Sequence, residues 1–220
     1  MIDFDGVVFD LDGTLWDTSE ACSVGWNRVR ARHGIPFREI VAADVRGVAG
    51  KPHEACIREV FRGLAELHIA TLVAETPEED NRLVAELGGA LFPGVPLGLN
   101  RLHRIVPLFI VSNCQAGYIE TFFRCTGFDP LFRDFECWGR TGLSKAENLR
   151  NVVARNGLEA PLFVGDTNGD QAAAAACGVP FIHASYGFGA CSEPDFSAQS
   201  FSDLIELLCA QPAAPKAMLQ

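Results

Sequence analysis

The sequence has too little positive charge for a general binder of nucleic acids or anionic membranes. Its 220 residues include 18 Lys and Arg against 28 Asp and Glu, a formal net charge of −10. Proteins that bind phosphate backbones or anionic lipids normally present a basic surface. The composition, 48% apolar and 21% charged, is that of a globular protein, and the length fits one large domain or a core with a smaller companion.

The chain also lacks any apolar run that approaches the ~20 residues of a membrane span. Its first residues, Met1-Ile2-Asp3-Phe4-Asp5, are acidic and are not followed by the apolar stretch of a signal peptide. We therefore expect a cytoplasmic protein, monomeric or homodimeric, that binds neither membranes nor nucleic acid.

The eight cysteines lack the paired spacing of a disulfide framework or a zinc site. No Cys-x-x-Cys pair occurs, and most of the cysteines stand beside apolar residues. This distribution predicts free, buried thiols in a reducing compartment. The positions are Cys22, Cys56, Cys114, Cys125, Cys137, Cys177, Cys191 and Cys209.

Short apolar runs, each bounded by polar residues or glycine, predict the strands of a parallel sheet. They lack the polar–apolar alternation of a sheet with one solvated face, so both faces should be covered. Helical patterns at 116–126, 145–156 and 169–177 lie between them, which predicts an α/β fold with a doubly wound, Rossmann-like parallel sheet. The predicted strands are Val7-Val8-Phe9, Leu108-Phe109-Ile110-Val111, Leu162-Phe163-Val164 and Pro180-Phe181-Ile182.

Residues 17–89 contain no strand-like run and read as a helical insertion. Apolar residues recur at helical spacing from Ile57 to Leu67. Thr76-Pro77-Glu78-Glu79 has the pattern of a capping box that starts a helix reaching Leu87. We expect a core domain of residues 1–16 and 90–220, a helical cap domain of residues 17–89, and a frayed tail around 211–215.

The strongest chemical signal is Asp10-Leu11-Asp12-Gly13, directly after the first predicted strand. Ligands bind at the carboxyl ends of the strands in open α/β sheets, so both carboxylates should face a ligand. One carboxylate can act as a nucleophile and the other as an acid and base. From this motif alone the alternatives are a turn or a calcium loop, but Thr14-Leu15-Trp16 does not supply the further oxygen ligands that a calcium loop needs. Asp3-Phe4-Asp5-Gly6 fits the same pattern, but no strand precedes it.

Three later segments should meet Asp10 and Asp12 at the same edge of the sheet. Ser112-Asn113 follows the second strand, and Asp166 and Asp170 follow the third. Lys145 comes directly after Ser144, whose spacing to Glu147 is that of a capping box, and a helix start favours an anion. Four acids at one edge would repel each other without a cation, and oxygen-only ligands indicate Mg²⁺.

With these four motifs in this order, and a helical insertion after the first, the sequence resembles the haloacid dehalogenase-like hydrolase superfamily, in its phosphoglycolate-phosphatase-like branch. The resemblance implies a phosphatase with Asp10 as nucleophile and Asp12 as general acid and base. It implies that Ser112, with Asn113 beside it, and Lys145 bind the phosphoryl group. It also implies Mg²⁺ held by Asp10, the backbone carbonyl of Asp12 and Asp166, with Asp170 as a supporting ligand.

Other readings stay open. A metal-free dehalogenase would lack the acid at Asp12. A phosphomutase would often carry Val at Thr14 and His at Cys22, and a phosphonatase would need a cap lysine, for which Lys51 is the candidate. A catalytically silent regulatory domain belongs to another class of function. Arg46 and Lys51, in a glycine-containing cap loop, are candidates for binding the remote part of a small phosphorylated metabolite, with phosphoglycolate as the first guess.

Overall fold

The computed structural model describes residues 3–209, and the structural statements below concern these residues. A six-stranded parallel sheet has the order β5-β4-β1-β6-β7-β8. Strand β1 lies inside it, with Val8 opposite Phe109 of β4 on one side and Phe163 of β6 on the other. The predicted α/β doubly wound fold is confirmed. The strands are β1 (Gly6–Phe9), β4 (Leu108–Ser112), β5 (Phe132–Cys137), β6 (Pro161–Gly165), β7 (Phe181–Ala184) and β8 (Phe196–Ala198).

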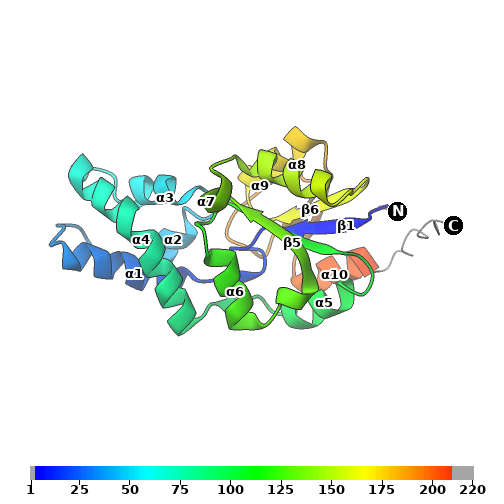
Figure 1. Cartoon of the computed structure of the whole chain (residues 1–220), viewed down its shortest axis with the longest axis horizontal. Coiled ribbons are helices and arrows are strands. Elements are labelled where there is room, and N and C mark those ends of the chain that lie inside the picture. The colour runs from blue at the N-terminus through cyan, green and yellow to red at the C-terminus, as the bar shows by residue number, and fades with distance from the viewer. Residues whose placement is uncertain (1–2, 210–220) are drawn as a thin grey trace.

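Helices cover both faces of the sheet (Figure 1). Residues of β1 alternate between the two faces: Val7 and Phe9 pack in one apolar cluster and Val8 in the other. The first cluster includes α5 (Val95–Leu102), α6 (Tyr118–Thr126) and α10 (Phe201–Cys209). The second includes α8 (Lys145–Arg155) and α9 (Asn168–Cys177). A 3₁₀ turn (Asp129–Leu131) and the short α7 (Trp138–Thr141) flank β5.

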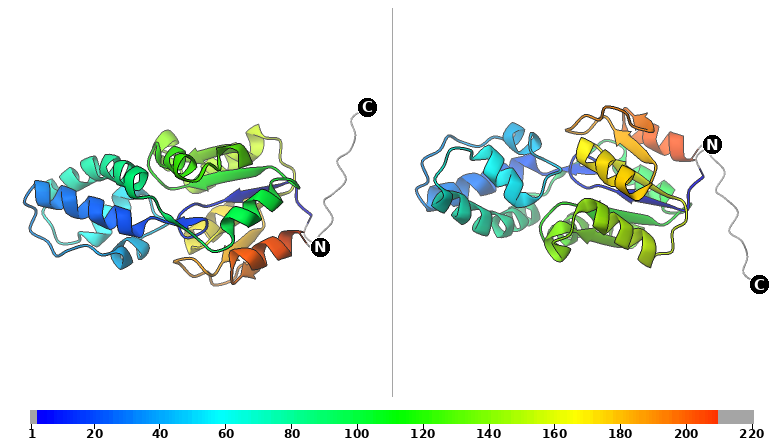
Figure 2. Two further views of the ribbon diagram at one scale, coloured as in Figure 1. Left: turned by 90° about the horizontal axis from the view of Figure 1, so that it is seen from below. Right: turned by 90° about the horizontal axis from the view of Figure 1, so that it is seen from above.

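A second lobe consists of four helices, which we call the helical segment (Figure 2). They are α1 (Ser19–Arg32), α2 (Ala42–Arg46), α3 (His53–Val60) and α4 (Glu66–Leu87). A separate apolar cluster that includes Trp26, Ile57 and Leu72 holds them together. Strands β2 (Trp16–Asp17) and β3 (Ala90–Leu91) pair antiparallel where the chain leaves and re-enters the sheet domain.

The predicted helix start at Thr76-Pro77 is wrong, because α4 runs straight through both residues. The buried Thr76 hydroxyl donates to the carbonyl of Leu72 at 2.6 Å instead of capping a new helix. Proline inside a helix loses one hydrogen bond and costs about 3 kcal/mol. Burial of Ile69 and Leu72 before it and of Leu83 after it holds the helix together despite that cost.

The sequence did not predict strands β5 and β8. Both are at the edges of the sheet and carry exposed polar residues. All eight cysteines are free as predicted, but only four are buried and Cys125 is exposed.

The predicted tail at 211–215 lies outside the described residues. Within 3–209, no helix combines the length and apolar character that a membrane crossing requires.

Candidate active site

Asp10 stands directly after β1, at the carboxyl edge of the sheet, and is 1% exposed. Its backbone N–H donates to the carbonyl of Val164 on β6 at 2.8 Å, which continues the sheet pairing into the site. Gly13 follows with φ +81°, and a Cβ there would overlap the carboxylate of Asp166. Only glycine allows this turn to lie against Asp166.

Three carboxylates converge at this edge. Single oxygens of Asp10, Asp166 and Asp170 all lie within 4.8 Å of one another, and all three residues are buried. Asp166 Oδ2 accepts the backbone N–H groups of Phe188 at 2.8 Å and Gly189 at 3.1 Å. Asp166 Oδ1 is buried and has no hydrogen-bond partner. An unpartnered, buried carboxylate oxygen is costly unless a cation or donor occupies the space in front of it.

Lys145 supplies the positive charge on the other side of the cluster. Its ammonium nitrogen is 2.8 Å from Asp10 Oδ1 and 2.5 Å from Asp170 Oδ1. The residue opens α8, where the predicted capping box of Ser144 and Glu147 is confirmed. The helix start therefore points a buried lysine at the two acids.

Burial and mutual repulsion set the electrostatics of the acids. Burial raises the pKa of Asp10 to about 7, although Lys145 opposes the shift. Burial, with the charge of Asp170, raises the pKa of Asp166 to about 6. Burial disfavours the charge of Lys145, but Asp10 and Asp170 outweigh it and raise the lysine pKa above its usual range. One ammonium group is thus shared among several acids, and a further cation would relieve the remaining repulsion.

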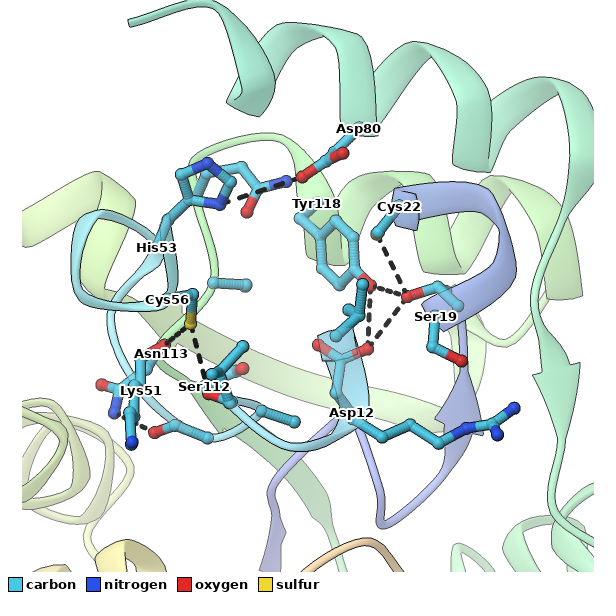
Figure 3. A pocket seen from close by; sticks show the side chains of 18 of the residues that line it. Asp12, Ser19, Cys22, Lys51, His53, Cys56, Asp80, Ser112, Asn113 and Tyr118 are labelled. Carbon is cyan, nitrogen blue, oxygen red and sulfur yellow. Dashed lines mark hydrogen bonds and ion pairs between the residues drawn. The ribbon is translucent and has the colours of Figure 1, made fainter. Parts of the chain in front are cut away.

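Asp12 is not part of this cluster of three carboxylates. Its Oδ1 accepts the hydroxyl of Tyr118 at 2.8 Å and that of Thr18 at 3.3 Å (Figure 3). Burial raises the pKa of Asp12 to about 7, and the Tyr118 hydrogen bond opposes the shift. Asp12 therefore has the geometry and the titration range of an acid–base group rather than of a side-chain metal ligand.

The donor set fits a hard divalent cation. All candidate ligands are oxygens, as Mg²⁺ prefers, and Asp166 Oδ1 is buried without a hydrogen-bond partner. Asp170 is less available, because Lys145 takes its Oδ1 while the N–H and hydroxyl of Thr167 donate to its Oδ2 at 3.0 and 2.7 Å.

A pocket of about 650 Å³, open solvent included, runs from Asp10, Asp12 and Ser112 to the helical segment. Asn113 lines it and donates from Nδ2 to the carbonyl of Gly50 at 2.8 Å, which connects the sheet domain to the loop before α3. Of the predicted phosphate-binding residues, Lys145 contacts Asp10, and Ser112 and Asn113 line the same pocket as Asp10. Their phosphate contacts stay predictions.

Arg46 and Lys51 also line the pocket, but both form ion pairs. Arg46 Nη2 is 2.8 Å from Asp17 Oδ2, and Lys51 Nζ is 2.5 Å from Glu59 Oε2. Substrate contact by either cation stays a prediction.

Asp5, in the rejected second Asp-x-Asp-Gly match, has a structural role. Its carboxylate accepts the N–H groups of Glu159 at 2.7 Å and Ala160 at 3.1 Å, next to the amino end of β6.

Sequence reasoning missed Tyr118, Thr18 and the loop around Gly187. Tyr118 and Asp12 are 106 positions apart, and no local pattern connects them. Gly187 had a readable signal in Gly187-Phe188-Gly189, where a Cβ at Gly187 would overlap Asp166 and the carbonyl of Gly13.

A carboxylate at the end of β1, a buried lysine and an acidic cluster thus lie together at the carboxyl edge of a Rossmann-like sheet. The haloacid dehalogenase-like hydrolase family model matches residues 7–184. The chain therefore belongs to that family, in its phosphoglycolate-phosphatase-like branch, and is a phosphoric monoester hydrolase.

Three relatives illustrate the match. A phosphoglycolate phosphatase of Yersinia pestis is 29% identical over 213 residues, covering 91% of each chain. One of Xanthomonas campestris is 31% identical over 189 residues, covering 83% of each. The structure of a haloacid dehalogenase-like hydrolase of Streptococcus pneumoniae has a TM-score of 0.81 at 21% identity, covering 93% of this chain and 98% of that one.

Proposed function

We propose that the protein is a Mg²⁺-dependent phosphatase that hydrolyses a small phosphorylated metabolite through a phosphorylated Asp10. One observation supports this most directly: Lys145 contacts Asp10 and Asp170 while the unpartnered Asp166 Oδ1 lies in the same cluster. The cluster combines a carboxylate nucleophile, a fixed positive charge and a buried carboxylate oxygen that has no hydrogen-bond partner. Phosphoryl transfer needs little more than positioning and charge neutralisation of this kind.

In this proposal Asp10 attacks phosphorus, and Lys145 stabilises the charge on the phosphoryl oxygens. Asp12, held by Tyr118 and Thr18, donates its proton to the leaving alkoxide. It then takes a proton from the water that cleaves the phosphoryl–Asp10 bond. Ser112 and the backbone beside Asn113 orient the phosphoryl group.

Asp10, Asp166 and the backbone carbonyl of Asp12 would hold Mg²⁺, with Asp170 in a supporting place. The ion would neutralise negative charge on the phosphoryl group and on the acids around it.

Residues 17–89 are proposed to act as a cap domain that closes over the pocket and excludes water. Phosphoglycolate is the first substrate to test, because curated relatives carry its name. Arg46 and Lys51 remain candidates for contacting its carboxylate after exchanging their present partners. A cytoplasmic location goes with this role.

The test is hydrolysis of an aryl phosphate and of phosphoglycolate, with and without Mg²⁺, by the wild type and by Asp10→Asn. The proposal predicts Mg²⁺-dependent phosphate release that Asp10→Asn abolishes. Phosphate release that persists in Asp10→Asn, or no release from any phosphomonoester, would refute it.

A further inference from the structure

The pocket has a second polar end, opposite Asp12, that the proposed chemistry does not use. His53, at the start of α3, and Asp80, on α4, face each other there (Figure 3). His53 is 8% exposed and Asp80 2%. The indole N–H of Trp26 donates to Asp80 Oδ2 at 3.0 Å and fixes the carboxyl group.

Hydrogen bonding defines which nitrogen of His53 is free to accept. The Thr76 hydroxyl donates to Leu72, so its oxygen accepts a hydrogen from His53 Nε2 at 2.7 Å. Burial lowers the pKa of His53 to about 4, which keeps the ring neutral. A neutral ring with its hydrogen on Nε2 presents a lone pair at Nδ1.

Two acceptor atoms therefore face each other without a donor between them. His53 Nδ1 is 3.8 Å from Asp80 Oδ2, beyond hydrogen-bond distance. A hydroxyl oxygen or an ammonium nitrogen about 2.8–3.0 Å from both atoms would fill the gap. Burial raises the pKa of Asp80 well above its usual range. An ammonium group can donate to both acceptors, and its positive charge would favour the ionised form of Asp80.

A carboxylate group of a substrate would bind poorly at the same place. It would bring further lone pairs against Nδ1 and Oδ2, and it has no hydrogen to donate to either atom. The pocket-lining cations Arg46 and Lys51 are engaged with Asp17 and Glu59.

We propose that His53 and Asp80 form the specificity-determining subsite for the leaving alcohol and select phosphomonoesters whose alcohol carries a hydroxyl or ammonium group rather than a carboxylate. This inference rests on the proposed phosphatase function. It narrows the substrate class away from phosphoglycolate itself.

A series of alkyl phosphates of matched length, differing only in the terminal group, provides the test. The first set is phosphoethanolamine, 2-hydroxyethyl phosphate, phosphoglycolate and propyl phosphate, in which a methyl group replaces the terminal amine or hydroxyl. A second set, one carbon longer in every member, tests a subsite that lies deeper in the pocket. The wild type should hydrolyse the best hydroxyl or ammonium member about ten- to hundredfold more efficiently, in kcat/KM, than its carboxylate counterpart, the effect of one hydrogen bond to a charged group. The better of those two members identifies the terminal group.

Asp80→Asn and His53→Gln should each lower kcat/KM for that member by about tenfold or more while changing propyl phosphate by less than about twofold. Glu86→Gln is the matched control, because Glu86 is an exposed acid on the same helix paired with Arg82. It should leave the whole series unchanged. Binding of the same compounds to Asp10→Asn, with and without Asp80→Asn, gives a readout independent of turnover.

Two results would overturn the inference. One is a carboxylate member as the best substrate; the other is an equal loss on all members in Asp80→Asn and His53→Gln. In either case Mg²⁺-dependent hydrolysis of an aryl phosphate would leave the proposed phosphatase function standing. Absence of that hydrolysis would refute both.

Discussion

The hydroxyl of Tyr118 and the carboxylate of Asp12 are joined by a hydrogen bond of 2.8 Å between the first turn of α6 and the loop after β1. Thr18 donates to the same oxygen and also contacts the Tyr118 hydroxyl. Asp12 therefore has two hydroxyl partners, whereas Asp10 contacts the ammonium group of Lys145. The proposed nucleophile Asp10 and the proposed acid–base group Asp12 are two residues apart in the sequence, but their side chains have different partners.

Tyr118→Phe removes the stronger of the two supports of Asp12. We expect kcat on alkyl phosphates to fall by about tenfold, because one hydrogen bond contributes about 1–1.5 kcal/mol. The kcat on aryl phosphates should fall less, because a phenolate is a good leaving group and needs little help from an acid. The measurement is kcat for one alkyl and one aryl phosphate in both proteins. Equal losses on the two leaving groups would contradict the role of Tyr118 in positioning the acid.

Metal removal tests the acidic cluster. EDTA should abolish turnover and added Mg²⁺ should restore it. Ca²⁺ should fail to restore it, because its larger and looser coordination shell misplaces the nucleophile. Asp166→Asn should raise the Mg²⁺ concentration needed for half-maximal activity by at least about tenfold. Full activity in EDTA would revive the metal-free dehalogenase alternative.

Lys145→Met tests the buried countercharge. In metal-free protein it should lower the free energy of unfolding by about 3 kcal/mol, because it leaves buried acids without their partner. It should also lower turnover on every phosphomonoester, since all carry the phosphoryl group. Arg58→Met is the control: Arg58 pairs with Glu54 and Glu66 at the surface, so its loss should leave the free energy of unfolding nearly unchanged. Denaturant unfolding compares the two, and equal losses would contradict the assignment.

His53 should make stability depend on pH. Its pKa is about 4 in the folded protein, against an ordinary value of 6.5 for histidine, so only the unfolded chain binds the proton between these values. The free energy of unfolding should therefore fall as pH drops from about 6.5 to 4, by up to ~3 kcal/mol from this residue, and the loss should level off below pH 4. His53→Gln should remove that part of the slope. Parallel unfolding profiles for wild type and His53→Gln would show that the ring is protonated in the native state.

The sequence predicted most of the sheet and the acids at its edge because that information is local. Val7-Val8-Phe9 is a continuous apolar run followed by Asp10, and Ser144 and Glu147 form a capping box within one turn. Edge strands such as β5 carry mixed residues and have no such signature. The local capping pattern at Thr76-Pro77 wrongly predicted a helix start, because burial along the length of α4 outweighs that pattern.

The side chains at the end of the pocket opposite Asp12 could not be predicted from the sequence, for a different reason. Trp26, His53 and Asp80 come from three helices and meet only through the packing of the helical segment. Each residue alone looks like an ordinary helix position.

The most direct measurement is mass spectrometry of protein quenched with acid during the first turnover on a phosphomonoester with Mg²⁺. The account predicts one phosphoryl group on the amino-terminal tryptic peptide, located at Asp10 by fragmentation and absent from Asp10→Asn. Asp5→Asn, which alters the second Asp-x-Asp-Gly match, should still be phosphorylated. A phosphoryl group on any other residue, or phosphate release by Asp10→Asn at the wild-type rate, would contradict Asp10 as the nucleophile.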